Sequence, residues 1–223
     1  MAVPVGVVFA GPSLRPPRPT PAGVEYRPPA KRGDIAQAVR DGVQVVGLID
    51  GVFHQSLAVT PAEVRQASNA GVRLFGGGSM GALRACECSD AMEGVGEIWR
   101  AFARGDLTDD DEVAVTFVPD TYEIVAYPLV QIREAARLAE GRYPECQVEL
   151  GRFVDAVRGL PFQERTLGAL RALGRILTEV GIPWVGMESW LTDVRFDVKR
   201  GDAVAVVEAV GREVAGVVGG QSL

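Results

Sequence analysis

A serine within a glycine-rich segment has the sharpest chemical signature in this chain. Ser79 stands at the centre of Gly77-Gly78-Ser79-Met80-Gly81, which fits the pattern G-x-S-x-G. The segment follows an apolar run at 72–75 and precedes a helical composition at 80–87, so we expect a strand, a tight turn and a helix. In such a turn, small flanking residues expose the hydroxyl and leave backbone N–H groups to hold an oxyanion. The same turn also suits an anion cradle or a purely structural role.

The general base for such a serine is not fixed by the sequence. His54 is the only histidine, and because it precedes Ser79, the order Ser, acid, His of the α/β-hydrolases is excluded. We consider three bases: His54, because imidazole titrates near neutrality; Asp50; and Lys199, if the C-terminal region folds back. A lone histidine is more often a surface or capping residue, which is the alternative for His54.

Two other loops are expected beside the Ser79 turn. In an open parallel sheet, ligands bind beyond the carboxyl ends of the strands, where helix N-termini point. Gly11 and Ser13 follow the first apolar run and Asp50 follows the second, so we expect both loops at the same edge as Ser79. The candidate substrate-binding and oxyanion groups are therefore those of Gly11, Ser13, Gly77, Gly78 and Met80.

Arg84 is the candidate cation of this site. It stands on the first turns of the helix that follows Ser79. A guanidinium at that position suits a substrate carboxylate, and a surface salt bridge is the alternative.

The acidic and sulfur-bearing residues do not predict a metal site. The acidic run 109–112 lacks the alternating spacing and glycine of a calcium loop, so we expect a solvated turn. Cys86, Cys88 and Cys146 are odd in number, and the spacing of the first two matches no zinc motif. We expect all three to be reduced thiols and Cys86 and Cys88 to be small buried groups, with a redox or sulfur-relay role as the alternative. We expect neither a metal nor a cofactor.

Composition narrows the class of protein. The 223 residues are 47% hydrophobic and 23% charged, which is the balance of a folded globular chain. A net charge of −6 offers no basic footprint for nucleic acid or an anionic membrane surface, so neither partner is expected. No apolar stretch is long enough to span a bilayer, and the start of the chain lacks a basic leader, so we expect a cytoplasmic protein.

Apolar runs and helical segments alternate along the first half of the chain. Strands are expected near 3–9, 43–49 and 72–75, separated by helices that begin near 33, 60 and 80. This alternation predicts an α/β fold with a doubly wound, mostly parallel sheet, either Rossmann-like or flavodoxin-like. We expect this core domain at 1–126 and a C-terminal helical region of about four helices at 127–223, packed on the core.

Several short segments form an ordered set over about residues 3–130. They are Phe9-Ala10-Gly11-Pro12-Ser13-Leu14, Pro28-Pro29-Ala30, Gly33-Asp34-Ile35, Leu48-Ile49-Asp50-Gly51-Val52-Phe53, Ser79-Met80-Gly81-Ala82-Leu83-Arg84-Ala85, Gly94-Val95-Gly96 and Asp111-Glu112-Val113-Ala114. Together they resemble the TfuA-like core domain, and the segment 198–203 resembles the closing segment of that family. Many relatives have His-Lys-Glu-Ile where this chain has Pro61-Ala62-Glu63-Val64, so no base is expected there, and His54 is the candidate to compensate.

The resemblance implies a role in thioamide formation. TfuA-like proteins accompany YcaO enzymes, and the pair converts backbone amides of ribosomally made peptides to thioamides. It implies that this chain is a hydrolase that releases sulfide from a thiocarboxylated ThiS-like sulfur carrier. Its expected partners are the YcaO enzyme and the carrier, with a precursor peptide and a second copy of the chain left open. The alternatives are a non-catalytic subunit that recruits the carrier and the YcaO enzyme, and a nucleotide-binding domain.

Overall fold

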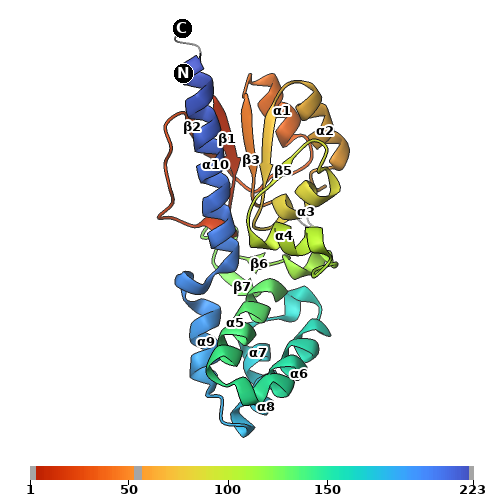
Figure 1. Cartoon of the computed structure of the whole chain (residues 1–223), viewed down its shortest axis with the longest axis vertical. Coiled ribbons are helices and arrows are strands. Elements are labelled where there is room, and N and C mark those ends of the chain that lie inside the picture. Colours follow the sequence, from red (N-terminus) through yellow and green to blue (C-terminus); the bar gives the residue numbers. More distant parts are fainter. Residues whose placement is uncertain (1–3, 53–56, 221–223) are drawn as a thin grey trace. The chain divides into compact units, whose positions relative to one another are not determined.

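The computed structural model describes residues 4–52 and 57–220, which fall into two compact units (Figure 1). The first, called here the sheet unit, comprises residues 1–108 together with 199–223. The second, called here the helical unit, comprises residues 109–198. In this division, residues 109–126 lie with the helical unit, and the last helix of the chain lies with the sheet.

The sheet has five parallel strands in the order β2-β1-β3-β4-β5. The strands are β1 (Gly6–Phe9), β2 (Val24–Arg27), β3 (Val45–Leu48), β4 (Arg73–Gly76) and β5 (Glu93–Gly94). This is the flavodoxin-like order, in which the direction of winding reverses between the first and third strands. Phe9 pairs with both Arg27 and Leu48, and Leu48 pairs with Gly76, so the strands end at a common edge. The predicted doubly wound α/β class is confirmed.

Four helices follow strands of the sheet in sequence. They are α1 (Asp34–Arg40), α2 (Pro61–Asn69), α3 (Met80–Glu87) and α4 (Glu97–Arg104). Alternate strand residues such as Val7, Val46 and Leu74 pack with side chains of α1, α2 and α3 in one apolar cluster. The start of α2 follows the predicted pattern, because the Thr60 hydroxyl accepts the Glu63 N–H at 3.2 Å and Pro61 occupies the first turn.

The other face of the sheet is covered by α10 (Val198–Gly220), which runs along it in Figure 1. Three strand-associated glycines lie under this helix. A β-carbon added to Gly6, Gly47 or Gly77 would lie only 2.6, 2.8 or 2.8 Å from a valine side chain of α10. The buried apolar side chains of the helix are Ala203, Val206, Val207, Ala209, Val210 and Val214, and each buried valine contributes roughly 1.5–3 kcal/mol. The apolar second face of the sheet is the reason that α10 belongs to this unit.

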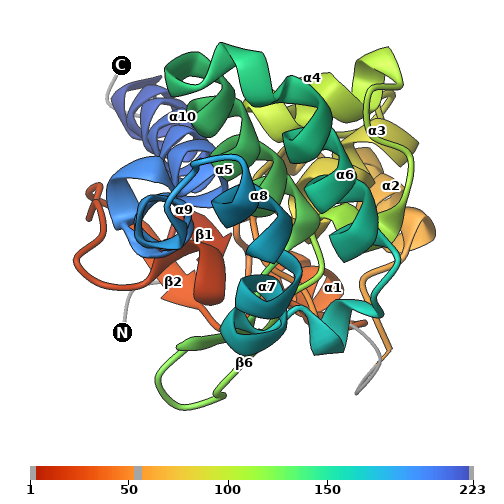
Figure 2. The same ribbon diagram turned by 90° about the horizontal axis from the view of Figure 1, so that it is seen from below.

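The helical unit consists of five helices and a hairpin. The elements are β6 (Thr116–Phe117), β7 (Ile124–Ala126), α5 (Leu129–Arg142), α6 (Gln147–Arg158), α7 (Leu167–Leu173), α8 (Arg175–Glu179) and α9 (Trp184–Thr192). In Figure 2, α5 lies between α6 and α9, and it packs against both. Their buried side chains, including Phe153, Leu170 and Met187, form a separate apolar cluster.

Two features interrupt the helical character of this unit. The strand β6 pairs antiparallel with β7 and does not join the parallel sheet. The segment 167–179 forms two helices, α7 and α8, separated at Gly174, where a β-carbon would lie 2.4 Å from the Trp184 ring. Within the described ranges, no helix combines the length and apolar character needed to cross a bilayer.

Candidate functional site

The Ser79 turn is fixed to the end of β3 at two points. The Gly77 N–H donates to the Leu48 carbonyl at 3.2 Å, and the Gly81 N–H donates to the Ile49 carbonyl at 3.1 Å. A β-carbon on Gly81 would lie 1.8 Å from the Leu48 carbonyl oxygen, so only glycine fits this close approach. Ser79 therefore lies in the turn between β4 and α3, as the sequence predicts.

In the turn between β4 and α3, the backbone N–H groups on either side of Ser79 make no hydrogen bond among the described residues. Gly78 has a φ of +73°, and the Ser79 N–H donates back to the Gly77 carbonyl at 2.8 Å. Among the described residues, no hydrogen bond engages the Gly78 or Met80 N–H groups. Of the predicted oxyanion donors, Gly78 and Met80 therefore keep that capacity, whereas the Gly77 N–H is committed to β3.

Ser79 itself is deeply placed. Only 4% of its surface is exposed, and its side chain does not cap α3. A β-carbon on Gly78 would lie 3.2 Å from the Lys199 carbonyl oxygen and 3.6 Å from the Ala203 nitrogen. The first turn of α10 therefore packs directly on the turn that carries Ser79.

Lys199 was a candidate base on the condition that the C-terminal region folds back, and this packing meets that condition. The C-terminal helix folds back onto the sheet, and its second residue, Lys199, is 4% exposed. The lysine thus comes to the Ser79 turn from 120 positions further along the chain. Its role as a base stays a prediction, as does that of His54, which lies outside the described residues.

The Asp50 carboxylate binds the loop after β1. Its carboxylate accepts the Gly11 N–H at 2.8 Å, the Ser13 N–H at 3.0 Å and the Ser13 hydroxyl at 2.6 Å. Asp50 and Ser13 are 2% and 3% exposed. Because both carboxylate oxygens and both amides are engaged, this geometry favours a structural role for all three residues over the predicted base and ligand-binding roles.

The Asp50 contacts also bear on nucleotide binding. In doubly wound folds the loop after the first strand offers its N–H groups to phosphate. Here the carboxylate of Asp50 already takes the N–H groups of Gly11 and Ser13 at the switch point between β1 and β3. A phosphate at this loop would have to displace a buried internal anion.

Arg84 adopts the alternative predicted for it. Its Nε donates to the Val59 carbonyl at 2.7 Å, and its Nη1 pairs with Glu87 at 2.6 Å. The side chain is 14% exposed. These contacts use the guanidinium to join α3 to the chain before α2, so a substrate carboxylate would compete with them.

One residue of the site was missed at the sequence level. Asp202, on the first turns of α10, accepts the Glu97 N–H at 2.8 Å and the Ile98 N–H at 2.9 Å, and so caps α4. Burial raises the pKa of the Asp202 carboxyl, and the two backbone N–H donors oppose that rise. No sequence signal marks this cap, because helix caps are normally local and the partners here are 104 and 105 positions apart.

Comparison with family models gives one match, to the TfuA-like protein family over residues 50–166. The chain belongs to this family. A comparison with curated proteins gave no match. Membership suggests a role in YcaO-associated, thioamide-related processes and an association with a YcaO-type partner in general. The matched segment includes Asp50, Ser79 and Arg84, but it ends before Lys199 and Asp202.

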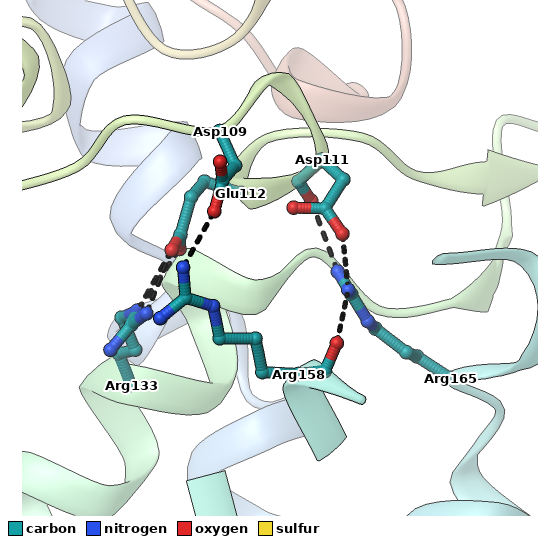
Figure 3. Close-up of polar contacts among 6 residues, drawn as sticks. All are labelled: Asp109, Asp111, Glu112, Arg133, Arg158 and Arg165. Atoms are coloured by element: carbon teal, nitrogen blue, oxygen red, sulfur yellow. Dashed lines mark hydrogen bonds and ion pairs between the residues drawn. The ribbon is translucent and has the colours of Figure 1, made fainter. Parts of the chain in front are cut away.

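The acidic run of this TfuA-like chain is paired with arginines (Figure 3). Glu112 is 2% exposed. Its carboxylate accepts hydrogen bonds from two guanidinium nitrogens of Arg133, at 3.0 and 2.7 Å. Asp109 pairs with Arg158 at 2.7 Å. The expectation of a solvated turn is therefore wrong for Glu112, whose carboxylate is buried and paired with the partly exposed side chain of Arg133.

Arg165 completes this cluster from a fully buried position. Its guanidinium pairs with the Asp111 carboxylate, donates to the Asp111 carbonyl at 3.1 Å and contacts the Arg158 carbonyl at 3.5 Å. Its Nε has no hydrogen-bond partner among the described residues. Across the described ranges, no group of three or more potential metal-ligating side chains is present.

The cysteines of the TfuA-like chain are not activated. Cys88 and Cys146 are buried and Cys86 is half-buried, and all three are free thiols. Burial raises the pKa of each thiol, which suppresses the nucleophilic thiolate. The predicted role as a small buried group holds for Cys88, whereas Cys86 is only half-buried.

Proposed function

We propose that this TfuA-like protein hydrolyses the C-terminal thiocarboxylate of a ThiS-like sulfur carrier and so supplies sulfide to a YcaO partner that forms thioamides in ribosomally made peptides. The observation that carries the proposal is the pair of amides, Gly78 and Met80, that flank Ser79 without a hydrogen-bond partner in the described chain. Backbone N–H groups without an internal partner beside a serine hydroxyl are the groups that an oxyanion site for acyl transfer requires.

The reaction uses the turn in two stages. The Ser79 oxygen attacks the carbonyl carbon of the thiocarboxylate, and the resulting oxyanion accepts the Gly78 and Met80 N–H groups. The C–S bond then breaks and sulfur leaves as HS⁻, carrying the proton that a base has taken from the serine. Water cleaves the carrier–serine ester, which returns Ser79 and a free carboxylate. The N-terminus of α3 favours the negative charge throughout.

The general base is one of two residues. Asp50 is engaged by three donors, which leaves His54 and Lys199 from the three predicted bases. Lys199 is supported by the packing of its turn of α10 on Gly78. Because HS⁻ is a good leaving group, a weak base suffices for this reaction.

A sulfide-release assay tests the catalytic role of Ser79. With purified thiocarboxylated carrier, we expect Ser79→Ala to lower kcat by about 100-fold or more, because the nucleophile is lost. Ser68→Ala is the matched control, since Ser68 is partly exposed near the end of α2, and it should keep the wild-type rate. Equal sulfide release by the Ser79→Ala and wild-type proteins would contradict the nucleophile.

The low exposure of Ser79 favours a second candidate function. At 4% exposed, its turn suits a non-catalytic subunit that holds the carrier terminus and recruits the YcaO enzyme. Calorimetry with the carboxylate and thiocarboxylate forms of the carrier separates the two functions. Binding of both forms without sulfide release, even with the YcaO partner present, would establish recruitment in place of hydrolysis.

A further inference from the structure

Three segments meet at the carboxylate of Asp202. The residue is 4% exposed and lies on the first turns of α10. Its two oxygens accept the first N–H groups of α4, from Glu97 and Ile98, at 2.8 and 2.9 Å. Gly96 has a φ of +98°, and a β-carbon there would lie 2.1 Å from the Asp202 carboxyl carbon. The chain before α4 is therefore shaped around this carboxylate.

The same segment forms one wall of the Ser79 turn. The Val95 N–H donates to the Gly76 carbonyl at 2.8 Å, and a β-carbon on Gly77 would lie 2.4 Å from the Val95 carbonyl oxygen. The opposite contact comes from α10, whose Lys199 carbonyl and Ala203 nitrogen lie against Gly78. Asp202 thus joins the two elements between which Gly77 and Gly78 are held.

The contacts of Asp202 are charge-assisted and few. Carboxylate acceptors bind N–H donors about twice as strongly as neutral acceptors do. Arg200, on the same turn of α10, donates to the Arg15 carbonyl at 2.9 Å and to the Pro17 carbonyl at 2.5 Å. No ion pair links Asp202 to an arginine or lysine among the described residues, and its two bonds to α4 form a polar link between α10 and this wall.

We propose that Asp202 is a positioning residue of the Ser79 site, which fixes the Gly78 N–H and Ser79 by clamping α4 to the first turn of α10. This inference rests on the proposed hydrolysis for its kinetic consequence, but its structural consequence is independent of any reaction. Removal of the carboxylate frees α4 from α10, and the turn between them loses its fixed walls. Asp202 itself touches no reacting atom.

The kinetic test compares Asp202→Ala and Asp202→Asn with Glu63→Gln. Glu63 is the matched control because its buried carboxylate also caps a helix of the sheet unit, accepting the Gly33, Ile35 and Ala36 N–H groups at 3.0, 3.0 and 3.2 Å. We expect Asp202→Ala to lower kcat for sulfide release roughly 10- to 100-fold with KM for the carrier nearly unchanged, because small misplacements are costly to rate. Asp202→Asn keeps one acceptor oxygen and should fall between Asp202→Ala and wild type, whereas Glu63→Gln keeps the wild-type kcat.

Hydrogen–deuterium exchange of the purified full chain tests the clamp without an assay of activity. We expect amides of the turn 77–81 to exchange at least about tenfold faster in Asp202→Asn than in wild type, with no such change in Glu63→Gln. If wild type releases no sulfide, the proposed function fails while this result still supports the clamp. Equal exchange of the turn in the Asp202→Asn and wild-type proteins overturns the inference, as does a loss of kcat of the same size in Glu63→Gln.

Discussion

The two units use their carboxylates differently. In the sheet unit, Asp50, Glu63 and Asp202 each accept backbone N–H groups of a loop or a helix start. In the helical unit, the acidic run 109–112 pairs instead with arginine side chains from α5, α6 and the loop before α7 (Figure 3). The first arrangement fixes the path of the backbone, and the second joins separate elements.

This difference bears on where chemistry is expected. A backbone N–H group has a fixed position, so a carboxylate that binds it holds the surrounding loop in one shape. The loops shaped in this way include the one after β1 and the segment beside the Ser79 turn. An arginine pair tolerates movement, because both partners have several rotatable bonds. The sheet unit is therefore the part of the chain built for a site of fixed geometry.

The largest effect is expected from removal of Arg165, the fully buried arginine of the cluster. Arg165→Ala should lower the free energy of unfolding of the helical unit by about 3–5 kcal/mol, because deletion of this large, fully buried side chain leaves a cavity. Urea titration followed by tryptophan fluorescence reports this change, since Trp184 and Trp190 both belong to that unit.

Arg158→Ala is the matched control for Arg165→Ala. The side chains of Arg158 and Asp109 are 50% and 49% exposed, so their pair should contribute less than about 1 kcal/mol. Similar losses in both variants would show that burial does not distinguish the members of this cluster.

The next-largest effect tests whether the Asp50 carboxylate occupies a site that would otherwise bind an anion. Asp50→Ala leaves two N–H groups and a hydroxyl unpaired, so we expect a loss of about 2–4 kcal/mol in the free energy of unfolding. Because the vacated N–H groups suit an anion, millimolar phosphate should raise the thermal midpoint of Asp50→Ala and leave that of wild type unchanged. A phosphate effect of equal size in the wild type would contradict an occupied position.

The sheet was predictable because its signals are local. Continuous β-branched runs followed by glycine mark β1, β3 and β4, and Thr60 with Pro61 marks the start of α2. The place of α10 was not predictable in the same way. Its apolar residues give a helix, but nothing in the pattern says which surface they cover. The glycines at 6, 47 and 77 are the one hint, since they make room for a helix on that face.

The sequence predicted where the candidate site lies, but it did not predict which of its residues bind one another. The G-x-S-x-G pattern and the sheet rule located Ser79 and the loops of Gly11 and Asp50. They did not reveal that Asp50 would bind the loop after β1, because its chemistry as an acid fits both roles. Asp202 gave no signal, since a cap that reaches across about a hundred residues leaves no spacing to recognise.

A smaller effect sharpens the contrast within the arginine pairs. A double-mutant cycle with Glu112→Gln and Arg133→Gln should give a coupling free energy of about 1–3 kcal/mol, because Glu112 is buried and its contact is bidentate. The same cycle on Glu134 and Arg137, an i,i+3 pair on α5, should give about 0.2–0.5 kcal/mol. Equal couplings would mean that burial of Glu112 does not strengthen its pair with arginine.

The smallest effect concerns the pH dependence of stability, for which the two units should have opposite signs. Burial raises the pKa of Asp202 in the folded protein, with Glu97 adding to the rise and the two N–H donors and Arg100 opposing it. The folded state then holds the proton more tightly than the unfolded chain. The stability contributed by this linkage is fully present below the unfolded pKa, and it is lost as pH rises through the raised folded value.

Asp193 in the helical unit behaves in the reverse way. Its hydrogen bonds with the Arg195 side chain and N–H lower its pKa to about 2. Its contribution is present above the unfolded pKa and is lost as pH falls toward the lowered value. Thermal midpoints of wild type, Asp202→Asn and Asp193→Asn across a pH series measure both. On acidification, the difference between wild type and variant should grow for Asp202→Asn and shrink for Asp193→Asn. The same slope in both variants would show that a carboxylate bound to buried N–H groups titrates like one bound to an exposed arginine.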